Sequence, residues 1–260
     1  MKNILSILLI SSIIFGCSEK RILIDELTNK GTKESQLMYS EKGLFNGIGY
    51  DVYTNGQLKS ESKYNNGKKD GTSKKWYENG HIKHEIKYKD GKMNGVYRGW
   101  YENGKLEFEF KYKDGKGNGS EKRWYENGQL KYEGILKDGK SEGLWIGWHE
   151  NGKLSWKNNY TNDKRDNFCK KWYENGQLEN EYKYKDGEEV GVHKSWYENG
   201  NLKTEVHYKD DKSDELWKNW YENGQLRYEG SSGDGFLKKW DVNGQLEYDG
   251  KSIEYNGTIE

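Results

Sequence analysis

The sequence repeats itself with a period of 24 residues. An aromatic-rich pentapeptide of the Trp-Tyr-Glu-Asn-Gly type begins at eight evenly spaced positions and once more, early, at Trp240; the eight positions are Val52, Trp76, Trp100, Trp124, Trp148, Trp172, Trp196 and Trp220. A fixed period of about 20 to 50 residues indicates that one small supersecondary unit is stacked many times, each copy burying part of its neighbour. The sequence therefore predicts an array of units rather than a globule built around one pocket.

Each repeat is predicted to contain two strands and two turns. In the unit that begins at Trp76, Asn79-Gly80 and Asp90-Gly91 are turn dipeptides, and the segments between them carry aromatic and β-branched residues. Turn signals recur too often for helices, and the chain has no proline to interrupt a ladder of hydrogen bonds. We expect an all-β fold, an elongated repetitive antiparallel β-meander in a single sheet, with about two strands per 24-residue repeat.

The alternation of apolar and polar residues predicts which face of the sheet is buried. In the fifth and seventh units the apolar residues fall on even numbers: Leu144, Ile146, Trp148, Leu154, Trp156 and Tyr160, and Val192, Trp196, Leu202, Val206 and Tyr208. If both turns have an odd number of loop residues, all these positions share one face, which we expect to be the core. The alternative is a two-residue Asn-Gly turn, which would turn Trp76 away from Ile82 and split the aromatic residues between the faces. The first reading is favoured by an apolar residue four positions before the tryptophan, as at Val96, Leu144, Phe168, Val192 and Leu216.

The array is expected to span residues 37–250, in about nine units, with ends that differ from the middle. Residues 22–50 are predicted to form an opening cap, because part of this segment looks like a degenerate unit, at Leu37, Tyr39, Leu44, Asn46 and Gly47. Residues 17–36 would be the tether and cap that precede the array, and residues 251–260 a polar tail.

The first residues read as a targeting signal. Met1 and Lys2 precede a mostly apolar run from Ile4 to Phe15, which is too short to cross a bilayer about 30 Å thick. The sequence Ile14-Phe15-Gly16-Cys17 resembles the lipobox of bacterial lipoproteins. That resemblance implies that residues 1–16 are a cleaved signal peptide and that Cys17 carries lipid. We therefore expect a membrane-anchored lipoprotein of the cell envelope, either periplasmic or surface-exposed.

Composition limits the classes of partner. Lys plus Arg and Asp plus Glu both number 43, so the net charge is zero and the strong basic field typical of nucleic-acid binding is missing. Cys169 is the second of two cysteines, so no disulfide within the chain is possible once Cys17 is lipidated. The periodic placement of 11 Trp and 21 Tyr predicts order despite a charged fraction of 33%.

The unit resembles the MORN repeat, and more closely its bacterial variant in YwqK-family antitoxin-like proteins. The matching residues are Trp100-Tyr101-Glu102-Asn103-Gly104, Lys105-Leu106, Glu109, Tyr112, Lys113-Asp114-Gly115-Lys116 and Gly119. The resemblance covers about residues 37–250 and implies an elongated sheet that serves as a scaffold or membrane-proximal module. The chain departs from the pattern at His149, Asn162-Asp163, Asn167, Asp210-Asp211 and Glu215.

Catalytic or metal-binding constellations are missing from the sequence. His81 and His84 are three residues apart, which on a strand places them on opposite faces, and His149, His193 and His207 stand alone. Cys169 reads as a small hydrophobic residue of a strand, and each Asp-Gly loop offers too few carboxylates for calcium. We expect no enzyme, no metal site and no cofactor.

The remaining feature is a column of tryptophans, Trp100, Trp124, Trp148, Trp172, Trp196 and Trp220, with Leu106, Leu130, Leu154, Leu178 and Leu202 beside it. An aromatic face left open would far exceed the few hundred Å² that monomers tolerate, so curvature, a second copy or a protein partner should cover it. We expect a protein-interaction scaffold. The alternatives are an antitoxin or immunity protein that neutralises a toxin, and glycan binding along a Trp/Tyr ladder with a pitch of about 9.6 Å.

Overall fold

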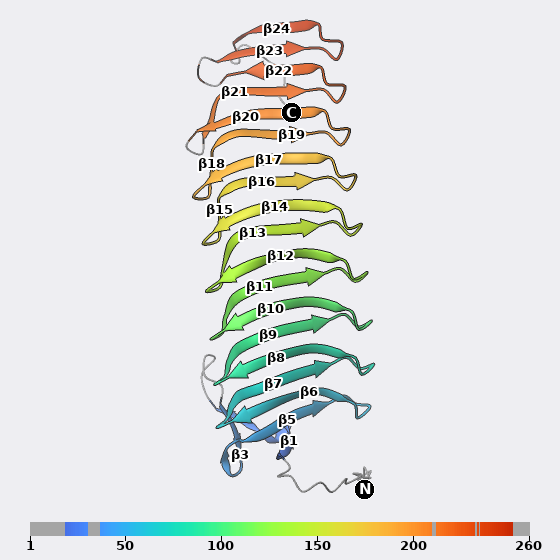
Figure 1. Ribbon diagram of the computed structural model, residues 1–260, viewed down its shortest axis with the longest axis vertical. Coiled ribbons are helices and arrows are strands. Elements are labelled where there is room, and N and C mark those ends of the chain that lie inside the picture. Colours follow the sequence, from blue (N-terminus) through green and yellow to red (C-terminus); the bar gives the residue numbers. More distant parts are fainter. Residues whose placement is uncertain (1–18, 31–36, 210–211, 232, 234, 252–260) are drawn as a thin grey trace.

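The computed structural model describes residues 19–30, 37–209, 212–231, 233 and 235–251. The strands lie across the long axis of a thin ribbon and follow one another in chain order from one end to the other (Figure 1). This confirms the elongated all-β meander with two strands per repeat. The expected signal peptide, Cys17 and nearly all of the expected tail lie outside the described residues.

The main sheet contains 21 strands. They are β1 (Arg21–Leu23), β5 (Gly47–Val52), β6 (Leu58–Asn65), β7 (Lys68–Trp76), β8 (Ile82–Lys89), β9 (Lys92–Trp100), β10 (Leu106–Lys113), β11 (Lys116–Trp124), β12 (Leu130–Lys137), β13 (Lys140–Trp148), β14 (Leu154–Thr161), β15 (Lys164–Arg165), β16 (Asn167–Trp172), β17 (Leu178–Lys185), β18 (Glu188–Glu189), β19 (Gly191–Trp196), β20 (Leu202–Lys209), β21 (Lys212–Trp220), β22 (Leu226–Gly230), β23 (Phe236–Trp240) and β24 (Leu246–Lys251). From β5 to β24 the recorded pairings are antiparallel, and the short β15 and β18 are the first parts of strands that continue as β16 and β19.

The turn after each repeated tryptophan is a three-residue hairpin loop. The Tyr77 N–H donates to the His81 carbonyl at 2.8 Å, and the Gly80 N–H donates back to the Tyr77 carbonyl at 3.0 Å. Gly80 has φ +87°, the left-handed conformation that glycine adopts without steric cost. Trp76 consequently pairs with Ile82, as the odd loop count predicts.

The second turn is different, because in most units its loop has two residues, whereas Gly230 pairs with Leu237 across a longer connection in the last one. Lys89 pairs with Lys92, and Asp90 and Gly91 between them have φ of 50° and 82°, the pattern of a type I′ turn. A bulge follows at Gly95, whose φ is 124°, and the register shifts there. The prediction that both turns have odd loop counts was therefore wrong for this turn, and even positions of one strand lie opposite odd positions of the next.

This parity divides the apolar residues between two faces. We call the packed face the side that bears the buried hydrophobic side chains of the main sheet, which are Tyr64, Ile86, Phe108, Trp145, Cys169, Tyr184, Tyr228 and Leu237. The open face is the opposite side. Along β13, Trp145 and Gly147 belong to the packed face, so by alternation Leu144, Ile146 and Trp148 belong to the open face. The prediction that all even positions share one buried face was wrong.

Aromatic rings that lie on glycines allow a single layer to pack without a second sheet. Gly99 is the cross-strand partner of Phe108, and Gly147 is the partner of Trp156. A Cβ at either glycine would overlap the ring of its partner. Each ring therefore covers the backbone of the neighbouring strand, which removes apolar area from water within one layer.

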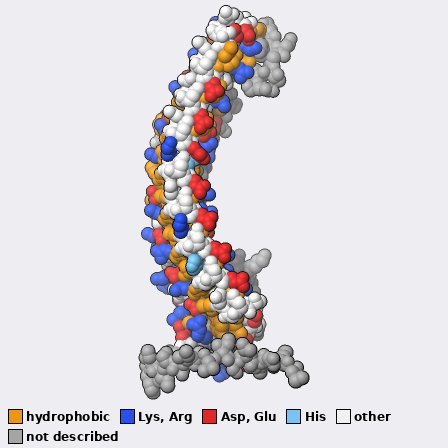
Figure 2. All heavy atoms as spheres, turned by 90° about the vertical axis from the view of Figure 1, so that its right-hand side faces the viewer, with side chains coloured by type: hydrophobic (Ala, Val, Ile, Leu, Met, Phe, Trp, Pro, Cys, Tyr) orange, Lys and Arg blue, Asp and Glu red, His pale blue; other side chains and the backbone are white. Residues whose placement is uncertain are grey.

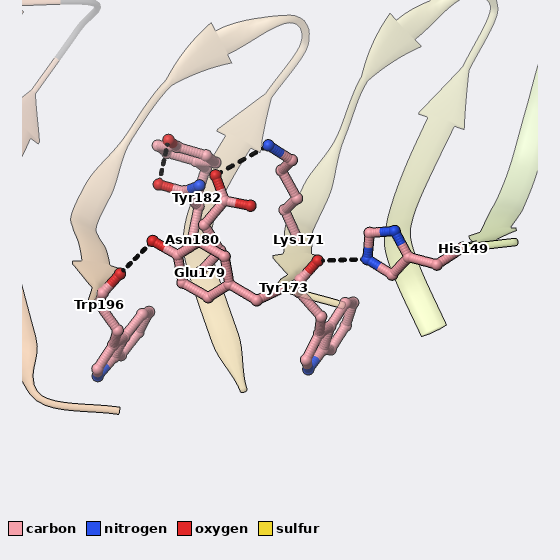
Figure 3. A network of polar contacts seen from close by, with 8 residues as sticks. His149, Lys171, Tyr173, Glu179, Asn180, Tyr182 and Trp196 are labelled. Carbon is pink, nitrogen blue, oxygen red and sulfur yellow. Dashed lines mark hydrogen bonds and ion pairs between the residues drawn. The ribbon is translucent and has the colours of Figure 1, made fainter. Parts of the chain in front are cut away.

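Side chains of the hairpin loops tie each unit to the next. The Tyr173 hydroxyl donates to the Trp196 carbonyl at 2.9 Å, and the same bond recurs from Tyr53, Tyr77, Tyr101, Tyr125, Tyr197 and Tyr221. His149, which departs from the repeat, keeps the contact, because its Nε2 lies 2.8 Å from the Trp172 carbonyl (Figure 3). These bonds repeat along one edge of the ribbon and fix the spacing of the loops.

The N-terminal end is closed by a cap that the sequence did not predict in this form. A separate three-stranded sheet contains β2 (Thr28–Lys30), β3 (Leu37–Ser40) and β4 (Gly43–Leu44), and a 3-10 turn, η1 (Ile24–Glu26), precedes it. Leu27, Phe45 and Tyr64 form its buried cluster. β1 pairs with β5 in parallel, whereas β5 already belongs to the array. Residues 37–44 thus form a hairpin, but in a sheet of their own.

Candidate interaction face

A row of exposed apolar side chains runs along the open face of the central and C-terminal units. Leu144, Phe168, Val192 and Leu216 occupy the same position in successive repeats and are 52, 46, 36 and 41% exposed, and Ile135 on β12 is 55% exposed. We call these five residues the apolar row. Sequence reasoning assigned four of them to the core, because the turn parity that places them on the open face depends on the two-residue loop.

Ion pairs occupy the middle of the same face. Each joins directly opposite residues of neighbouring strands: Lys74–Glu85, Arg98–Glu109, Lys122–Glu133, Lys170–Glu181, Lys194–Glu205, Lys218–Glu229 and Lys238–Asp249, at 2.6 to 3.5 Å. In the fifth unit Ile146 stands at this position, opposite Lys157. The row of ion pairs is interrupted there, and Ile135, Leu144 and Ile146 leave an apolar area near the middle of the ribbon.

The predicted tryptophan column lies on the open face as well. Trp100, Trp124, Trp148, Trp172, Trp196 and Trp220 are half-buried. The first five pair across the strands with the five leucines expected beside them, as Trp100 does with Leu106, and Trp220 pairs with Leu226. The six side chains thus form one column, which the row of ion pairs separates from the apolar row except in the fifth unit, where Ile146 lies between them. The lipidation candidate, Cys17, lies outside the described residues.

Viewed from the edge that carries the three-residue loops, the ribbon is thin and bowed (Figure 2). Acidic side chains follow one another along this edge, and hydrophobic and basic side chains gather on the convex side. The sequence places one exposed glutamate in most of these loops, at Glu78, Glu102, Glu126, Glu150, Glu174, Glu198 and Glu222. The overall charge of zero is therefore not evenly distributed over the surface.

Comparison with known protein families matches the repeat itself. The model described as "MORN repeat variant" matches residues 45–66, 69–90, 93–114, 118–138, 141–162, 169–186, 189–210 and 216–232, more than half of the chain. The chain belongs to the MORN repeat variant family. No curated protein matches it. Among solved structures, one chain of the "Crystal Structure of TcdB2-TccC3-Cdc42" is similar at 12% identity and a TM-score of 0.22, with 82% of this chain and 13% of that chain covered.

The family pattern can now be explained from the geometry of this MORN array. The later glycine of the repeat sits in the bulge, with positive φ at Gly71, Gly95, Gly119, Gly143 and Gly191. Asn167 replaces it in one unit and keeps a φ of 65°, because asparagine tolerates the left-handed region better than most residues. The departures at His149 and Asn167 are thus accommodated without loss of the sheet.

Titratable groups of the MORN array are shifted mainly by burial. Burial raises the pKa of Tyr132 to about 12, with a further contribution from its hydrogen bond to Glu121 at 2.8 Å. Burial also raises the pKa of the Cys169 thiol, which keeps it protonated and unreactive at neutral pH. Burial lowers the pKa of His84, with smaller effects from nearby lysines.

The histidines singled out in the sequence do not converge. His81 Nδ1 lies 2.8 Å from the Glu102 carbonyl in the loop edge, whereas His84 stacks near Tyr97 and Phe108 on the packed face. Within the described residues of the MORN array, no group of three or more His, Cys, Asp or Glu side chains is arranged to hold a metal ion. The described helical content, a single 3-10 turn, includes no segment long and apolar enough to cross a membrane.

Proposed function

We propose that this protein is a non-enzymatic repeat scaffold, anchored in the bacterial cell envelope by lipid at Cys17, that binds a protein partner across its open face. MORN repeats are commonly modules for protein interaction or membrane binding. The observation that carries the proposal is the apolar row, which stays exposed on an otherwise charged face.

The composition of the open face supports a protein as the partner. Interfaces between proteins combine an apolar centre with aromatic residues and a polar rim. Here the apolar row and the half-buried tryptophan column flank paired charges, which can be partly desolvated without leaving an unpaired ion. From Leu144 to Leu216 the row covers three repeats, about 29 Å at about 9.6 Å per two strands, a length that suits an interface of standard size.

The experiment is a comparison of two triple variants in envelope extracts, with chemical crosslinking and mass spectrometry of the captured proteins. The test variant combines Leu144→Ser, Phe168→Ser and Val192→Ser; the control combines Val52→Ser, Val242→Ser and Leu246→Ser, which are exposed apolar residues outside the row. Because all six side chains are exposed, both variants should melt close to the parent protein. We expect one partner in stoichiometric amount with the parent and the control, and its loss with the test variant.

Retention of the same partner by the test variant, at unchanged affinity, would contradict the use of this face. An antitoxin or immunity role would use the same surface, and it predicts that co-expression rescues cells from a specific toxin. Glycan binding would use the tryptophan column, and it predicts binding on a glycan array that survives loss of the apolar row. Rescue from a toxin would replace the scaffold assignment with an antitoxin role. Glycan binding without a captured protein would replace it with a glycan-binding role.

The anchor is tested separately from the binding face. Cys17→Ser should move the protein from the membrane fraction to the soluble fraction and abolish lipid modification of the N-terminal peptide in mass spectrometry. A wild-type protein with an unmodified Cys17 would refute the anchor and leave the scaffold proposal to the capture experiment.

A further inference from the structure

A hollow of about 360 Å³ lies on the packed face at the N-terminal end of the array. Strands β6 to β9 form its floor, and Ile24 of the 3-10 turn η1 forms part of its wall. It is thus bounded by the cap on one side and by the sheet on the other. Its size is within the range of about 300 to 1,000 Å³ usual for small-molecule sites.

The hollow exists because rings that fill this face elsewhere are missing here. Ser62 pairs with Ser73, and Ser60 pairs with Lys75 on the adjacent strand. The position of Ser73 is occupied by a ring in four later repeats, at Tyr97, Trp145, His193 and Trp217, and by Glu121 and Cys169 in the other two. Serines in place of larger side chains leave a space in this face.

One side chain in the lining of the hollow has a hydroxyl without a partner among the described residues. Ser73 is only 7% exposed, and its Oγ forms no hydrogen bond among the described residues. The Oγ itself is almost completely shielded from solvent, so Ser73 borders the hollow as a small side chain that leaves space.

The charged groups around the hollow are cations. Lys69, Lys74 and Lys75 line it, and no described aspartate or glutamate does; Lys74 is paired with Glu85 on the open face. The Lys69 ammonium lies 5.1 Å from the centre of the Tyr88 ring, and no described carboxylate forms an ion pair with Lys69 or Lys75. Burial lowers the pKa of Lys69, and the neighbouring charge of Lys75 lowers it further. An anion placed beside Lys69 would offset the lowering of its pKa, because a nearby negative charge favours the protonated ammonium.

The rest of the lining is apolar and aromatic. Ile86, Tyr88, Met93 and Tyr97 form one side, and Tyr97 contacts His84, with ring centres 5.7 Å apart. A ligand that consisted only of an inorganic ion would leave this side uncovered. The lining as a whole therefore favours a molecule with one acidic group and one apolar part.

We infer that the hollow binds a small organic anion, with its acidic group held by Lys69 and Lys75 and its ring or short chain against Tyr88 and Tyr97. This site is on the opposite face from the proposed protein interface and is independent of it. Carboxylates and phosphate monoesters share the required chemistry, and the test separates them.

The test follows the methyl signal of Met93 by NMR in the full chain labelled at methionine methyl groups. Met93 lines the hollow, whereas Met38 packs against the cap cluster and serves as an internal reference. The compounds are phenyl phosphate, benzoate, inorganic phosphate and phenol, each titrated to millimolar concentration. We expect saturable shifts at Met93, larger than those at Met38, with phenyl phosphate or benzoate, and weaker effects with phosphate or phenol.

Two variants and a control connect the signal to the hollow. Ser73→Tyr introduces the residue that stands at the same position one repeat later, so it should fold and fill the space, and it should abolish binding. Lys69→Met should weaken binding about tenfold, the equivalent of one charge-assisted hydrogen bond. Ser120→Tyr makes the same change on the open face and should leave binding unchanged.

Several results would overturn the inference. One is a wild-type Met93 signal that none of the four compounds shifts, and another is unchanged binding by Ser73→Tyr. Vesicles that contain phosphatidic acid form a further arm; a Met93 response to these vesicles without any response to phenyl phosphate would assign the site to a lipid surface instead. If Ser73→Tyr does not fold by circular dichroism, the affinity of Lys69→Met decides, and an unchanged value refutes the site.

Discussion

The contact between Gly99 and the Phe108 ring gives a test of how this one-layer sheet packs. The effect of Gly99→Ala on stability should change sign when the ring is removed. A Cβ at Gly99 would overlap the Phe108 ring, and Gly99 does not have positive φ, so the substitution Gly99→Ala adds overlap without backbone strain. Overpacking costs about 1 to 3 kcal/mol, and the reduced entropy of the unfolded chain offsets about 0.4 to 1 kcal/mol. We expect Gly99→Ala to destabilise the protein by about 1 to 2 kcal/mol.

In a Phe108→Val background the overlapping ring is gone, so the same substitution should stabilise by about 0.4 to 1 kcal/mol. The two effects of opposite sign give a coupling of about 1.5 to 3 kcal/mol. The assay is amide hydrogen exchange of β9 and β10, because repeat arrays open locally and one global unfolding transition is not assured. The same sign in both backgrounds would refute the account of rings lying on glycine.

A matched control is available in the seventh unit, where Ser195 stands at the position of Gly99 and pairs with Thr204. This pair shows that the backbone at that position accepts a Cβ when the partner is small. Ser195→Gly should therefore destabilise β19 and β20 by about 1 to 2.5 kcal/mol, because it adds backbone entropy to the unfolded chain and removes the hydrogen bond between the Ser195 and Thr204 hydroxyls. A stabilising effect would mean that backbone conformation, rather than the partner ring, decides where the repeat requires glycine.

Three further predictions concern single contacts. Tyr125→Phe removes the hydroxyl that donates to the Trp148 carbonyl at 2.9 Å and should cost about 0.5 to 1.5 kcal/mol in urea unfolding; no measurable cost would show that the loop bonds do not hold the units together. Glu133→Gln breaks a partly exposed ion pair with Lys122 and should cost less than about 1 kcal/mol, a difference that shrinks in 1 M salt, whereas a larger, salt-independent loss would contradict the low weight given to these pairs. The pKa of Tyr132 is raised to about 12 in the folded state, so its contribution to folding stability is complete below pH 10 and is lost as the pH rises toward 12. Tyr132→Phe should therefore reduce the loss of stability between pH 10 and 12. An identical pH dependence of stability in both proteins would argue against the raised pKa.

The sequence was a sufficient guide to the architecture but not to the faces of the sheet. The 24-residue period, the turn dipeptides and the absence of proline predict a meander of two strands per unit, and the structure has this form. Which residues are buried depends on loop parity, and Asp90-Gly91 could close either a two-residue or a longer loop on sequence evidence. The type I′ turn and the bulge at Gly95 shift the pairing, so Leu144 is exposed while Trp145 is buried.

The candidate sites were less predictable because they arise where repeats differ rather than where they agree. The tryptophan column was recognised from its period, and its pairing with leucines followed from the odd loop. The hollow was not recognised, because Ser60, Ser62 and Ser73 become neighbours only when the register between β6 and β7 is known. A comparison of equivalent positions across the repeats, made with the correct parity, would have detected the loss of rings at these serines.

In a sheet of one layer, each side chain belongs to one face, and a repeat can change one face while the other stays constant. Along the array, the packed face changes at its N-terminal end, where serines replace rings, while the ion pair of the same unit, Lys74 with Glu85, is kept on the open face. The open face changes near the middle, where Ile146 replaces a paired charge, while Trp145 and Trp156 fill the packed face. The two proposed sites therefore lie at different units and on opposite sides of the ribbon. Because mutations more than about 7 to 10 Å apart without shared partners usually have additive effects, Ser73→Tyr and the triple change in the apolar row should each remove one kind of binding and leave the other intact.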